Sequence, residues 1–256
     1  MKISVAMLAK DASAIIGDAL ESVDWADEVV VGIDSRTSDD TAEVAGKFAN
    51  ARIVSASLAE GFGVAKNTLI DEARNDWVLV MDTDERVTPE LKQAIISADF
   101  ETCQAYRVHR LNYVLGRAMR HGGLWPQDRP VRLINRHYAH YDSKPVHETM
   151  QVDGNIGTIG EYFTHLTHPT VASIMERVER CAPFEAELIV AEFAKSGKRI
   201  GVKELVWPAT KRFVGKLVIK RGWKDGIPGL IEIVCMTFYA FYNHAKAWEL
   251  QQQKDL

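Results

Sequence analysis

The first hundred residues alternate between short apolar runs of strand type and amphipathic runs of helix type, which limits the fold more than any other feature. The strand-like runs are Ile3–Leu8, Glu28–Ile33, Arg52–Val54 and Trp77–Met81. Helical patterns begin near Ser13, at Thr37 to Ser38 (extending through Phe48), at Val64, and at Thr88, where Pro89 suits a first helical turn. This order predicts an α/β fold with a mostly parallel sheet and helices on both faces.

Two aspartates follow the fourth strand-like run directly, in the sequence Asp82-Thr83-Asp84. In extended backbone, alternate side chains point to the same side, so both carboxylates can face one point. Carboxylate oxygens at the end of a buried strand suit Mg²⁺ or Mn²⁺, the ions that accompany diphosphates. Ligands of α/β sheets bind beyond the carboxyl ends of the strands, where Asp34 is also expected. The alternative for the tripeptide alone is a chance pair in an acidic loop.

Asp34 ends the second strand-like run and precedes a polar segment, Ser35 to Thr41. Its carboxylate can accept hydrogen bonds from a pyrimidine N–H or a ribose hydroxyl. Helix capping is the alternative for this segment, and it explains part of Thr37 to Asp39. It does not explain Asp34, which precedes the cap by several residues.

A second loop, Glu60 to Asn67, holds two glycines around an aromatic residue in the sequence Gly61-Phe62-Gly63. Glycines let the backbone approach a ligand closely, and the start of a helix favours anions. We therefore expect Lys66 and Asn67 in the first turn of the next helix. The alternative is an ordinary loop with a glycine cap.

Composition is that of a globular protein: 256 residues, 46% of them hydrophobic, with a formal net charge of -4. This length allows one large domain or one domain with an extension. The three cysteines, Cys103, Cys181 and Cys235, are far apart and match neither a zinc pattern nor a disulfide framework. With no signal-peptide pattern after Met1, they predict a cytoplasmic location.

Positive charge is concentrated between Lys195 and Lys224, which contain ten Lys or Arg and one acid, Glu204. The segment carries 10 − 1 = +9, so the remainder carries −4 − 9 = −13. The apolar stretch that follows, Ile227–Tyr242, is shorter than the ~20 residues of a membrane span. These features predict peripheral binding to an anionic membrane surface. The alternative is a helix packed on the domain with its basic residues solvated. Nucleic-acid binding motifs are absent, so no nucleic-acid partner is expected.

Several motifs, in their order and spacing, resemble the family 2 glycosyltransferases, and within them the lipopolysaccharide core-type glucosyltransferases. In the first half they are Asp34-Ser35 with Ser38-Asp39 and Thr41, Gly61-Phe62-Gly63 with Lys66-Asn67, and Asp76–Leu79 with Asp82–Glu85. In the second half they are Tyr113–Arg117, Met119–Pro126, Val131–Leu133, Val146–Glu148, Leu166–His168 and Arg221–Gly226. The resemblance covers nearly the whole chain.

The resemblance implies a GT-A fold, a nucleotide-diphosphate sugar donor with UDP-glucose as first choice, and an inverting mechanism. It implies Mg²⁺ or Mn²⁺ as cofactor and a lipopolysaccharide core, or another glycan or lipid-linked molecule, as acceptor. The nucleotide-sugar-binding residues would be Asp34, Ser35, Gly63, Lys66, Asn67, Asp82 and Arg132. The metal ligands would be Asp82, Asp84 and His168. For His168 the alternative is a histidine that caps the helix after Pro169.

An inverting transfer needs a general base that removes the proton of the acceptor hydroxyl. Glu148 is the first candidate and Asp128 the second. For either residue the structural alternative is an ion pair with Arg132. Three features depart from the family pattern: Asp11-Ala12 in place of Asn-Glu, Asp40 in place of glycine, and Gln127–Pro130 before Val131.

The expected domains are a catalytic domain over residues 1–170 and a helical, basic and amphipathic extension over 171–256. Within the former, residues 1–100 would bind the nucleotide and 101–170 the acceptor, because the middle segment is rich in aromatics and histidines. Two other functions stay open. A sugar nucleotidyltransferase would have glycines after the first strand, where Ala9–Ser13 has none. A non-enzymatic protein that binds anionic surfaces would use only the basic segment.

Overall fold

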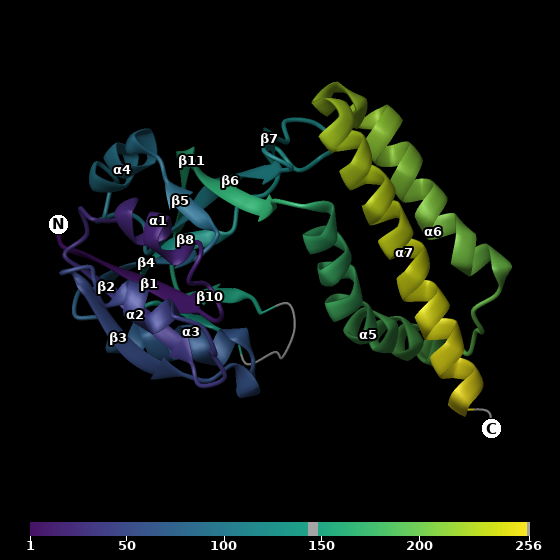
Figure 1. The fold of residues 1–256 in the computed structure, drawn as a ribbon, viewed down its shortest axis with the longest axis horizontal. Coiled ribbons are helices and arrows are strands. Elements are labelled where there is room, and N and C mark those ends of the chain that lie inside the picture. Colours follow the sequence, from purple (N-terminus) through teal and green to yellow (C-terminus); the bar gives the residue numbers. More distant parts are fainter. Residues whose placement is uncertain (143–147, 255–256) are drawn as a thin grey trace. The chain divides into compact units, whose positions relative to one another are not determined.

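A computed structural model describes residues 1–142 and 148–254 of the chain. The chain divides into two compact units, each with its own hydrophobic core (Figure 1). The first unit comprises Met1–Arg110 and Asp128–His165. The second comprises Leu111–Gln127 and Leu166–Leu256, so a short segment from the middle of the sequence joins the carboxy-terminal part.

The main sheet has the strand order β3-β2-β1-β4-β8-β6-β11-β5, with β7 paired to β6. Its strands are β1 (Ile3–Ala9), β2 (Glu28–Asp34), β3 (Ala51–Ala56), β4 (Trp77–Asp82), β5 (Glu85–Val87), β6 (Ala105–Val114), β7 (Arg117–Ala118), β8 (Val131–Asn135) and β11 (Ile156–His168). Strands β3, β2, β1 and β4 are parallel, as the alternating pattern predicts. Strand β8 pairs antiparallel with β4 and with β6, and β5 pairs antiparallel with β11. The parallel strands thus all lie within Ile3–Asp82, and β5 and β8, which come after them, pair antiparallel with their neighbours.

Helices cover both faces of the parallel half: α1 (Ile16–Glu21), α2 (Thr41–Ala45), α3 (Phe62–Glu72) and α4 (Pro89–Ile96). Successive residues of β1 enter different cores, because side chains alternate along a strand. Met7 packs in the core that contains residues of α1, α2 and α4, whereas Ala6 packs in the core that contains Leu69 and Ile70 of α3. Both cores depend on β4, whose central position places its carboxyl end in the middle of the sheet edge.

Two predicted helix starts have different outcomes. Helix α4 begins as expected, since Thr88 Oγ1 accepts a hydrogen bond from Leu91 N at 3.1 Å. Helix α2 begins at Thr41, later than predicted. The residues before it are held by another loop instead: Ser38 N donates to Asp11 Oδ1 at 2.8 Å, and Asp39 Oδ2 accepts from Ser13 N at 3.0 Å. This contact uses Asp11, one of the departures from the family pattern.

The second unit is built from three long helices, α5 (Val171–Ser196), α6 (Val202–Val214) and α7 (Gly226–Lys254), with α7 packed against the other two. Helix α5 contains Pro183 and bends along its length (Figure 1), as a proline inside a helix predicts. A π-helical turn, Gly215–Ile219, and a 3₁₀ turn, Gly222–Asp225, join α6 to α7. Among the described residues, no helix combines the length and the apolar character that a membrane span requires. Smaller elements are the 3₁₀ turn Leu58–Glu60 and the hairpin pair β9 (Ala139–Tyr141) and β10 (Met150–Val152), both in the first unit.

Candidate active site

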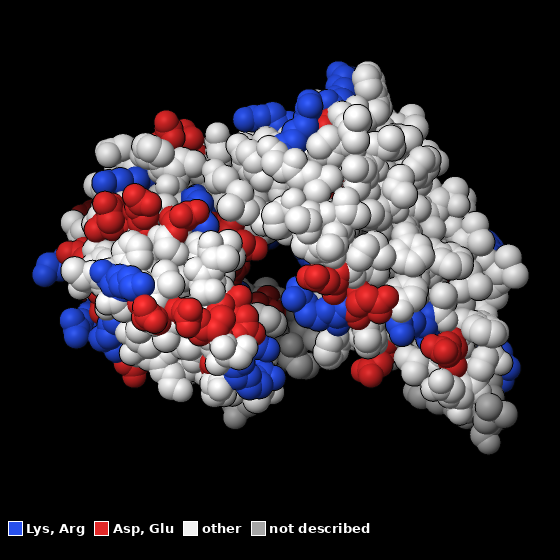
Figure 2. Space-filling view, in the orientation of Figure 1, with Lys and Arg blue, Asp and Glu red and all other residues white. Residues whose placement is uncertain are grey.

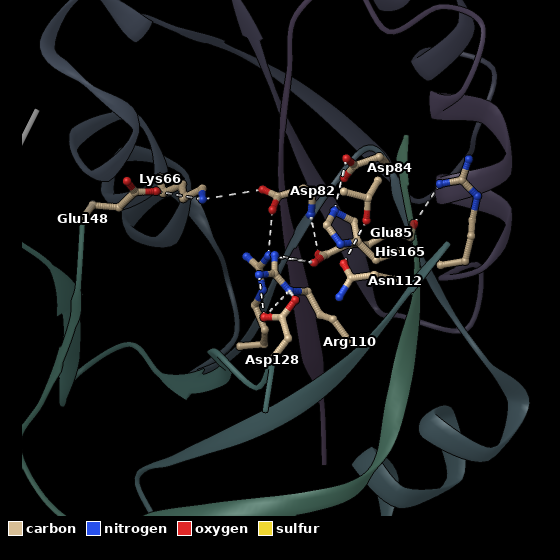
Figure 3. A network of polar contacts seen from close by, with 12 residues as sticks. Lys66, Asp82, Asp84, Glu85, Arg110, Asn112, Asp128, Glu148 and His165 are labelled. Atoms are coloured by element: carbon tan, nitrogen blue, oxygen red, sulfur yellow. Dashed lines mark hydrogen bonds and ion pairs between the residues drawn. The ribbon is translucent and has the colours of Figure 1, made fainter. Parts of the chain in front are cut away.

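The two aspartates of the Asp-x-Asp sequence face different partners. Asp82 is the last residue of β4, and Thr83 and Asp84 form the turn into β5. The turn ends the alternation of side chains along the strand, so the strand geometry applies only as far as Asp82. That both carboxylates face one ion stays a prediction. Asp82 faces Lys66 and Arg132, whereas Asp84 Oδ2 lies 3.3 Å from Nε2 of His165 (Figure 3). Both carboxylates remain accessible, with the Asp82 side chain 33% and the Asp84 side chain 36% exposed.

Asp82 is held ionised by two cations. Its Oδ2 accepts from Arg132 Nη2 at 2.6 Å, and its Oδ1 lies 3.5 Å from Lys66 Nζ. Burial raises the pKa of the Asp82 carboxyl, but the opposing attraction of Arg132 and then Lys66 is greater, and the pKa falls well below its usual range.

Below Asp82, a buried network fixes the strand end. Arg132 and Glu85 are both buried, and Arg132 Nη2 donates to Glu85 Oε1 at 2.7 Å. Glu85 Oε2 accepts a hydrogen bond from the backbone N of Asp82 at 2.9 Å, so Glu85 also holds the main chain of Asp82 in place. Burial lowers the pKa of the Arg132 guanidinium, but Asp82 and Glu85 raise it well above the usual value. Arg132 therefore stays charged and positions the carboxylate of Asp82.

Lys66 links Asp82 to Glu148. Its Nζ lies 3.2 Å from Glu148 Oε1 and 5.3 Å from the centre of the Tyr141 ring. Burial lowers the pKa of the Lys66 ammonium, but the Asp82 carboxylate and further negative groups give a net rise. Helix α3 begins at Phe62, two residues earlier than predicted, so Lys66 lies in its second turn and not in its first. It reaches the site from the side of the helix.

Gly63 and Asn67, two of the residues expected to bind the donor, pack α3 against the end of β9. A Cβ on Gly63 would lie 2.5 Å from the carbonyl oxygen of Asp142, so only glycine fits without movement. The Asn67 side chain donates to the carbonyl of Tyr141 at 2.9 Å and accepts from its N–H at 2.8 Å. These contacts hold α3, which carries Lys66, against β9, while any contact of Gly63 or Asn67 with a donor stays a prediction.

Asp34 is buried and bound to its own loop. Its Oδ1 accepts from the backbone N of Arg36 at 2.9 Å and from Arg36 Nε at 3.0 Å, and its Oδ2 accepts from Leu58 N at 2.7 Å. The hydrogen bond from the Arg36 side chain, with the two backbone N–H groups, outweighs burial and lowers the pKa of Asp34 to about 2. Ser35 is exposed beside it. Asp34 thus fixes the loop beyond β2, and its contact with a nucleoside stays a prediction.

Both candidate bases form ion pairs, but neither pairs with Arg132. Asp128 accepts from Arg110 through both oxygens, with Nε at 3.1 Å from each and Nη2 at 2.7 Å from Oδ1. Arg110 Nη1 also lies 3.5 Å from Glu85 Oε1, which joins Asp128 to the buried network. Glu148 pairs with Lys66 as described above. The structural alternative of an ion pair is therefore met for both residues, with Lys66 and Arg110 as the cations in place of Arg132.

The whole cluster carries excess negative charge. It contains five carboxylates (Asp82, Asp84, Glu85, Asp128 and Glu148) and three cations (Lys66, Arg110 and Arg132), so 3 − 5 gives a formal −2. Within residues 1–142 and 148–254, no group of three or more His, Cys, Asp or Glu is arranged to hold a metal ion. The arrangement thus offers two accessible carboxylates, two flanking cations and a nearby third carboxylate.

The family model described as "Glycosyl transferase family 2" matches residues 4–166, which include every residue of this cluster. The chain belongs to glycosyl transferase family 2. The sequence resemblance to that family is therefore confirmed, and the protein is a glycosyltransferase.

Similar proteins agree with this assignment. The lipopolysaccharide core biosynthesis glycosyltransferase LpsC of Rhizobium meliloti is 25% identical over 97% of this chain and 93% of its own length. An uncharacterised glycosyltransferase of Rickettsia typhi is 24% identical over 97% of this chain and 87% of its own. A solved mannosyltransferase of Pyrobaculum calidifontis, in complex with GDP-Man and Mn²⁺, superposes with a TM-score of 0.54 at 13% identity, covering 97% and 87% of the two chains. The predicted GT-A fold with a helical carboxy-terminal extension is confirmed.

In the first unit of this glycosyltransferase, the histidine that contacts Asp84 is His165. His168 is buried in the second unit, where its carbonyl accepts from Leu115 N at 2.8 Å. It does not cap α5, because the N-cap is Thr170. A metal contact of His168 stays a prediction.

Three residues of the site were not singled out from the sequence: Glu85, Arg110 and His165. The sequence did offer a signal for Glu85, since it follows Asp84 directly in the motif Asp82–Glu85. Arg110 and His165 had no such signal in the sequence, because they lie on strands β6 and β11, far along the chain from Asp84. His165 lies at the site because it is paired with Glu85 where β11 meets β5. Such pairing between distant strands cannot be derived from spacing in one sequence.

Proposed function

We propose that this glycosyltransferase moves a sugar from a nucleotide-diphosphate donor, with UDP-glucose as first choice, to a lipopolysaccharide core or another glycan or lipid-linked acceptor. The observation that carries the proposal is the pair of accessible carboxylates, Asp82 and Asp84, at the end of a central parallel strand between cations. The name of the R. meliloti relative supports the acceptor class. The GDP-Man in the P. calidifontis complex supports a nucleotide-sugar donor, although the sugar differs.

The donor would lie beyond the carboxyl ends of β2 and β4. Asp34 and Ser35 are proposed to meet the nucleoside, since they follow β2. Lys66 and Arg132 are proposed to offset the charge of the diphosphate, because both are cations beside Asp82. Gly63 and Asn67 would act through the placement of α3, which positions Lys66.

The donor atoms present fit a hard divalent cation. Asp82 and Asp84 offer carboxylate oxygens, the ligands that Mg²⁺ and Mn²⁺ prefer, in a cluster with surplus negative charge. Those two residues would hold the ion, with His168 as the expected further ligand and His165 as a second candidate because it contacts Asp84. When bound, the ion would offset charge that grows on the departing diphosphate.

An inverting transfer proceeds by attack of an acceptor hydroxyl on C1, on the side opposite the diphosphate. We propose Glu148 as the group that takes the hydroxyl proton, because its Oε1 lies 3.2 Å from Lys66 Nζ, beside the proposed donor site. Asp128 is the second candidate, and its two oxygens are both engaged by Arg110. Glu148 would stay charged and oriented through Lys66.

The proposed setting is the cytoplasmic face of the inner membrane, with peripheral binding to anionic lipid and no nucleic-acid partner. Three free cysteines agree with a reducing compartment. The basic segment before α7 supports attraction to anionic lipid.

The proposal is tested by a thermal-shift screen of nucleotide sugars with and without Mn²⁺, followed by a transfer assay with the best donor. Ligand binding raises the melting temperature by mass action, so the true donor should stand out from the other nucleotide sugars. We expect a UDP-sugar to give the largest rise, and Mn²⁺ to increase it. If no nucleotide sugar shifts the protein, or if the chain releases pyrophosphate from a nucleoside triphosphate and a sugar phosphate, the proposed reaction is wrong.

A further inference from the structure

Helix α7 exposes an uncharged face to solvent. Its first seventeen residues, Gly226 to Tyr242, contain a single charged residue, Glu232, and that residue is buried. Large apolar side chains are exposed at helical spacing along the same helix: Ile227, Leu230, Val234, Phe238, Phe241 and Trp248. A helix that faces water normally carries polar residues on its outer side, so this face is suited to an apolar partner.

Helix α6 adds a second apolar row beside the first. Val202, Val206, Val214 and Val218 are exposed at spacings of four or eight residues along α6 and the π-helical turn after it. Between the two rows lies an open groove of about 320 Å³, lined by Val206, Ala209, Thr210, Phe213, Thr237, Phe238 and Phe241. Figure 2 shows a broad area without charged residues over α6 and α7. The rows and the groove form one surface, called here the α6–α7 face.

One end of this face is strongly basic. Segments 117–126 and 220–226 overlap motifs of the family resemblance that lie outside the cluster around Asp82, and the structure brings the two segments together. Asp225 accepts from the backbone N and from the ring Nδ1 of His121, at 2.9 Å and 2.8 Å, and Gly122 N donates to the Lys220 carbonyl at 3.0 Å. The exposed cations on the two segments are Arg117, Arg120, Lys220, Arg221 and Lys224. In Figure 2, Lys and Arg gather at this end, where α6 gives way to α7.

The same end presents large apolar side chains to solvent. Ile219 and Ile227 are each 75% exposed, and Trp223 between them is 57% exposed. The His121–Asp225 contacts fix the backbone beneath them, so these side chains are displayed by a rigid turn. Apolar tips with cations around them match a bilayer surface, where phosphates lie above acyl chains.

We propose that the α6–α7 face, with its basic end, docks the enzyme on an anionic lipid bilayer. The cations of the two segments bind lipid phosphates, Ile219, Trp223 and Ile227 enter the interface, and the groove accepts acyl chain. Charge complementarity commits this surface to lipid, because a cationic end next to an uncharged face matches anionic headgroups above hydrocarbon. The inference rests on the proposed function and deepens its peripheral membrane binding by naming the surface, from which a lipid-linked acceptor would reach the enzyme in the plane of the membrane.

The test is flotation of the full chain with vesicles of phosphatidylglycerol and phosphatidylethanolamine, compared with phosphatidylcholine vesicles. Lys220→Ala with Lys224→Ala removes two surface cations, and Ile219→Ser with Ile227→Ser removes two exposed tips. We expect about fivefold weaker partitioning for each cation lost, and so about 25-fold for the pair. For each exposed Ile that enters the interface the loss should be on the order of tenfold. The Lys pair should lose its effect at high salt, and the Ile pair should keep it.

Matched controls on the first unit separate this surface from general changes in charge and hydrophobicity. Lys2→Ala with Lys47→Ala removes two exposed cations, and Ile96→Ser removes one exposed Ile. Both should float like the native chain. Equal losses in controls and test variants, or no flotation of the native chain with anionic vesicles, would overturn the proposal. So would a native dimer that Ile219→Ser with Ile227→Ser dissociates, since the face would then join two copies.

A separate readout keeps this inference apart from the reaction. Asp82→Asn should float like the native chain, and the surface variants should show the same donor-induced thermal shift as the native chain. If the donor shift is absent in every form but flotation follows the expected pattern, the reaction is wrong and the docking surface stands. If flotation fails while the donor shift persists, the reverse holds.

Discussion

Lys66 Nζ lies 3.2 Å from Glu148 Oε1, although the two residues are 82 positions apart in the sequence. The same nitrogen lies 3.5 Å from Asp82 Oδ1. The buried cation of Lys66 therefore lies between two carboxylates. One is Glu148, the proposed general base, and the other is Asp82, which is proposed to face the diphosphate. Any change of charge at one carboxylate is transmitted to the other through Lys66.

Replacement of the two strand-end aspartates should abolish transfer. In Asp82→Asn and Asp84→Asn the charge that would hold a cation and its diphosphate is lost, and we expect rates at least about 10²-fold lower. Steady-state transfer assays, with circular dichroism to confirm folding, measure this. Each carboxylate is about a third exposed, so neither change should open a core. Full activity in both variants, or in the native enzyme with EDTA, would contradict the metal role.

Glu148→Gln should lower kcat far more than it weakens donor binding. A base acts in the transition state, so its loss appears in the chemical step. The matched variant is Asp128→Asn, which removes the other candidate and leaves Arg110 without its bidentate partner. Donor affinity by thermal shift should be near native in Glu148→Gln. If Glu148→Gln transfers normally and Asp128→Asn is inactive, the base is Asp128.

The fold of the first hundred residues follows from the sequence because its signals are local. Apolar runs, the Thr88-Pro89 start and the alternation of strand and helix patterns depend on neighbours in the chain, and β1 to β4 and α4 appear as predicted. Helix α2 was placed too early because Ser38 and Asp39 bond to the loop after β1, at Asp11 and Ser13. Ser and Asp side chains are interpreted as a helix cap when their partners elsewhere in the chain are not known.

The site was only partly predictable for the same reason. Asp82, Lys66, Glu148 and Asp128 were identified as candidates, but their partners were not. Arg110 meets Asp128 and His165 meets Asp84, because antiparallel strands after residue 105 bring these side chains to the end of β4. Register between such strands depends on packing across the sheet and not on spacing along the chain.

Asp34 should stabilise the protein in a pH-dependent way. Its folded pKa of about 2 lies below the ordinary 3.8, so the stabilisation is present above about pH 4 and is lost as pH falls from 4 towards 2. At pH 7, Asp34→Asn should lower the free energy of unfolding by about 1.5–3 kcal/mol, the range for hydrogen bonds to a charged group. Urea unfolding at pH 7 and pH 3 should show a smaller difference at pH 3. Asp24→Asn, which removes the charge of an exposed residue, is the control, and its effect on stability at pH 7 should be small.

Arg132→Met should destabilise the protein strongly. The change leaves Glu85 buried without the cation 2.7 Å away, and removal of one partner of a buried ion pair costs about 3–5 kcal/mol. Arg132→Lys should recover only part of this, because an ammonium lacks the planar fork of the guanidinium. Thermal or urea unfolding measures both variants. A Met variant with native stability would show that the pair contributes nothing net.

The two histidines at the end of β11 can be distinguished by metal dependence. His165 Nε2 lies 3.3 Å from Asp84 Oδ2, whereas His168 is the residue that matches the family pattern. If His168 binds the ion directly, His168→Gln should raise the Mn²⁺ concentration needed for half-maximal transfer by about 10-fold or more, and His165→Gln should raise it less, because His165 would act through Asp84. A larger effect at His165 would assign the ligand to that residue. His137→Gln, on an exposed histidine paired with Asp76, is the control, and an equal effect there would remove both histidines from the metal site.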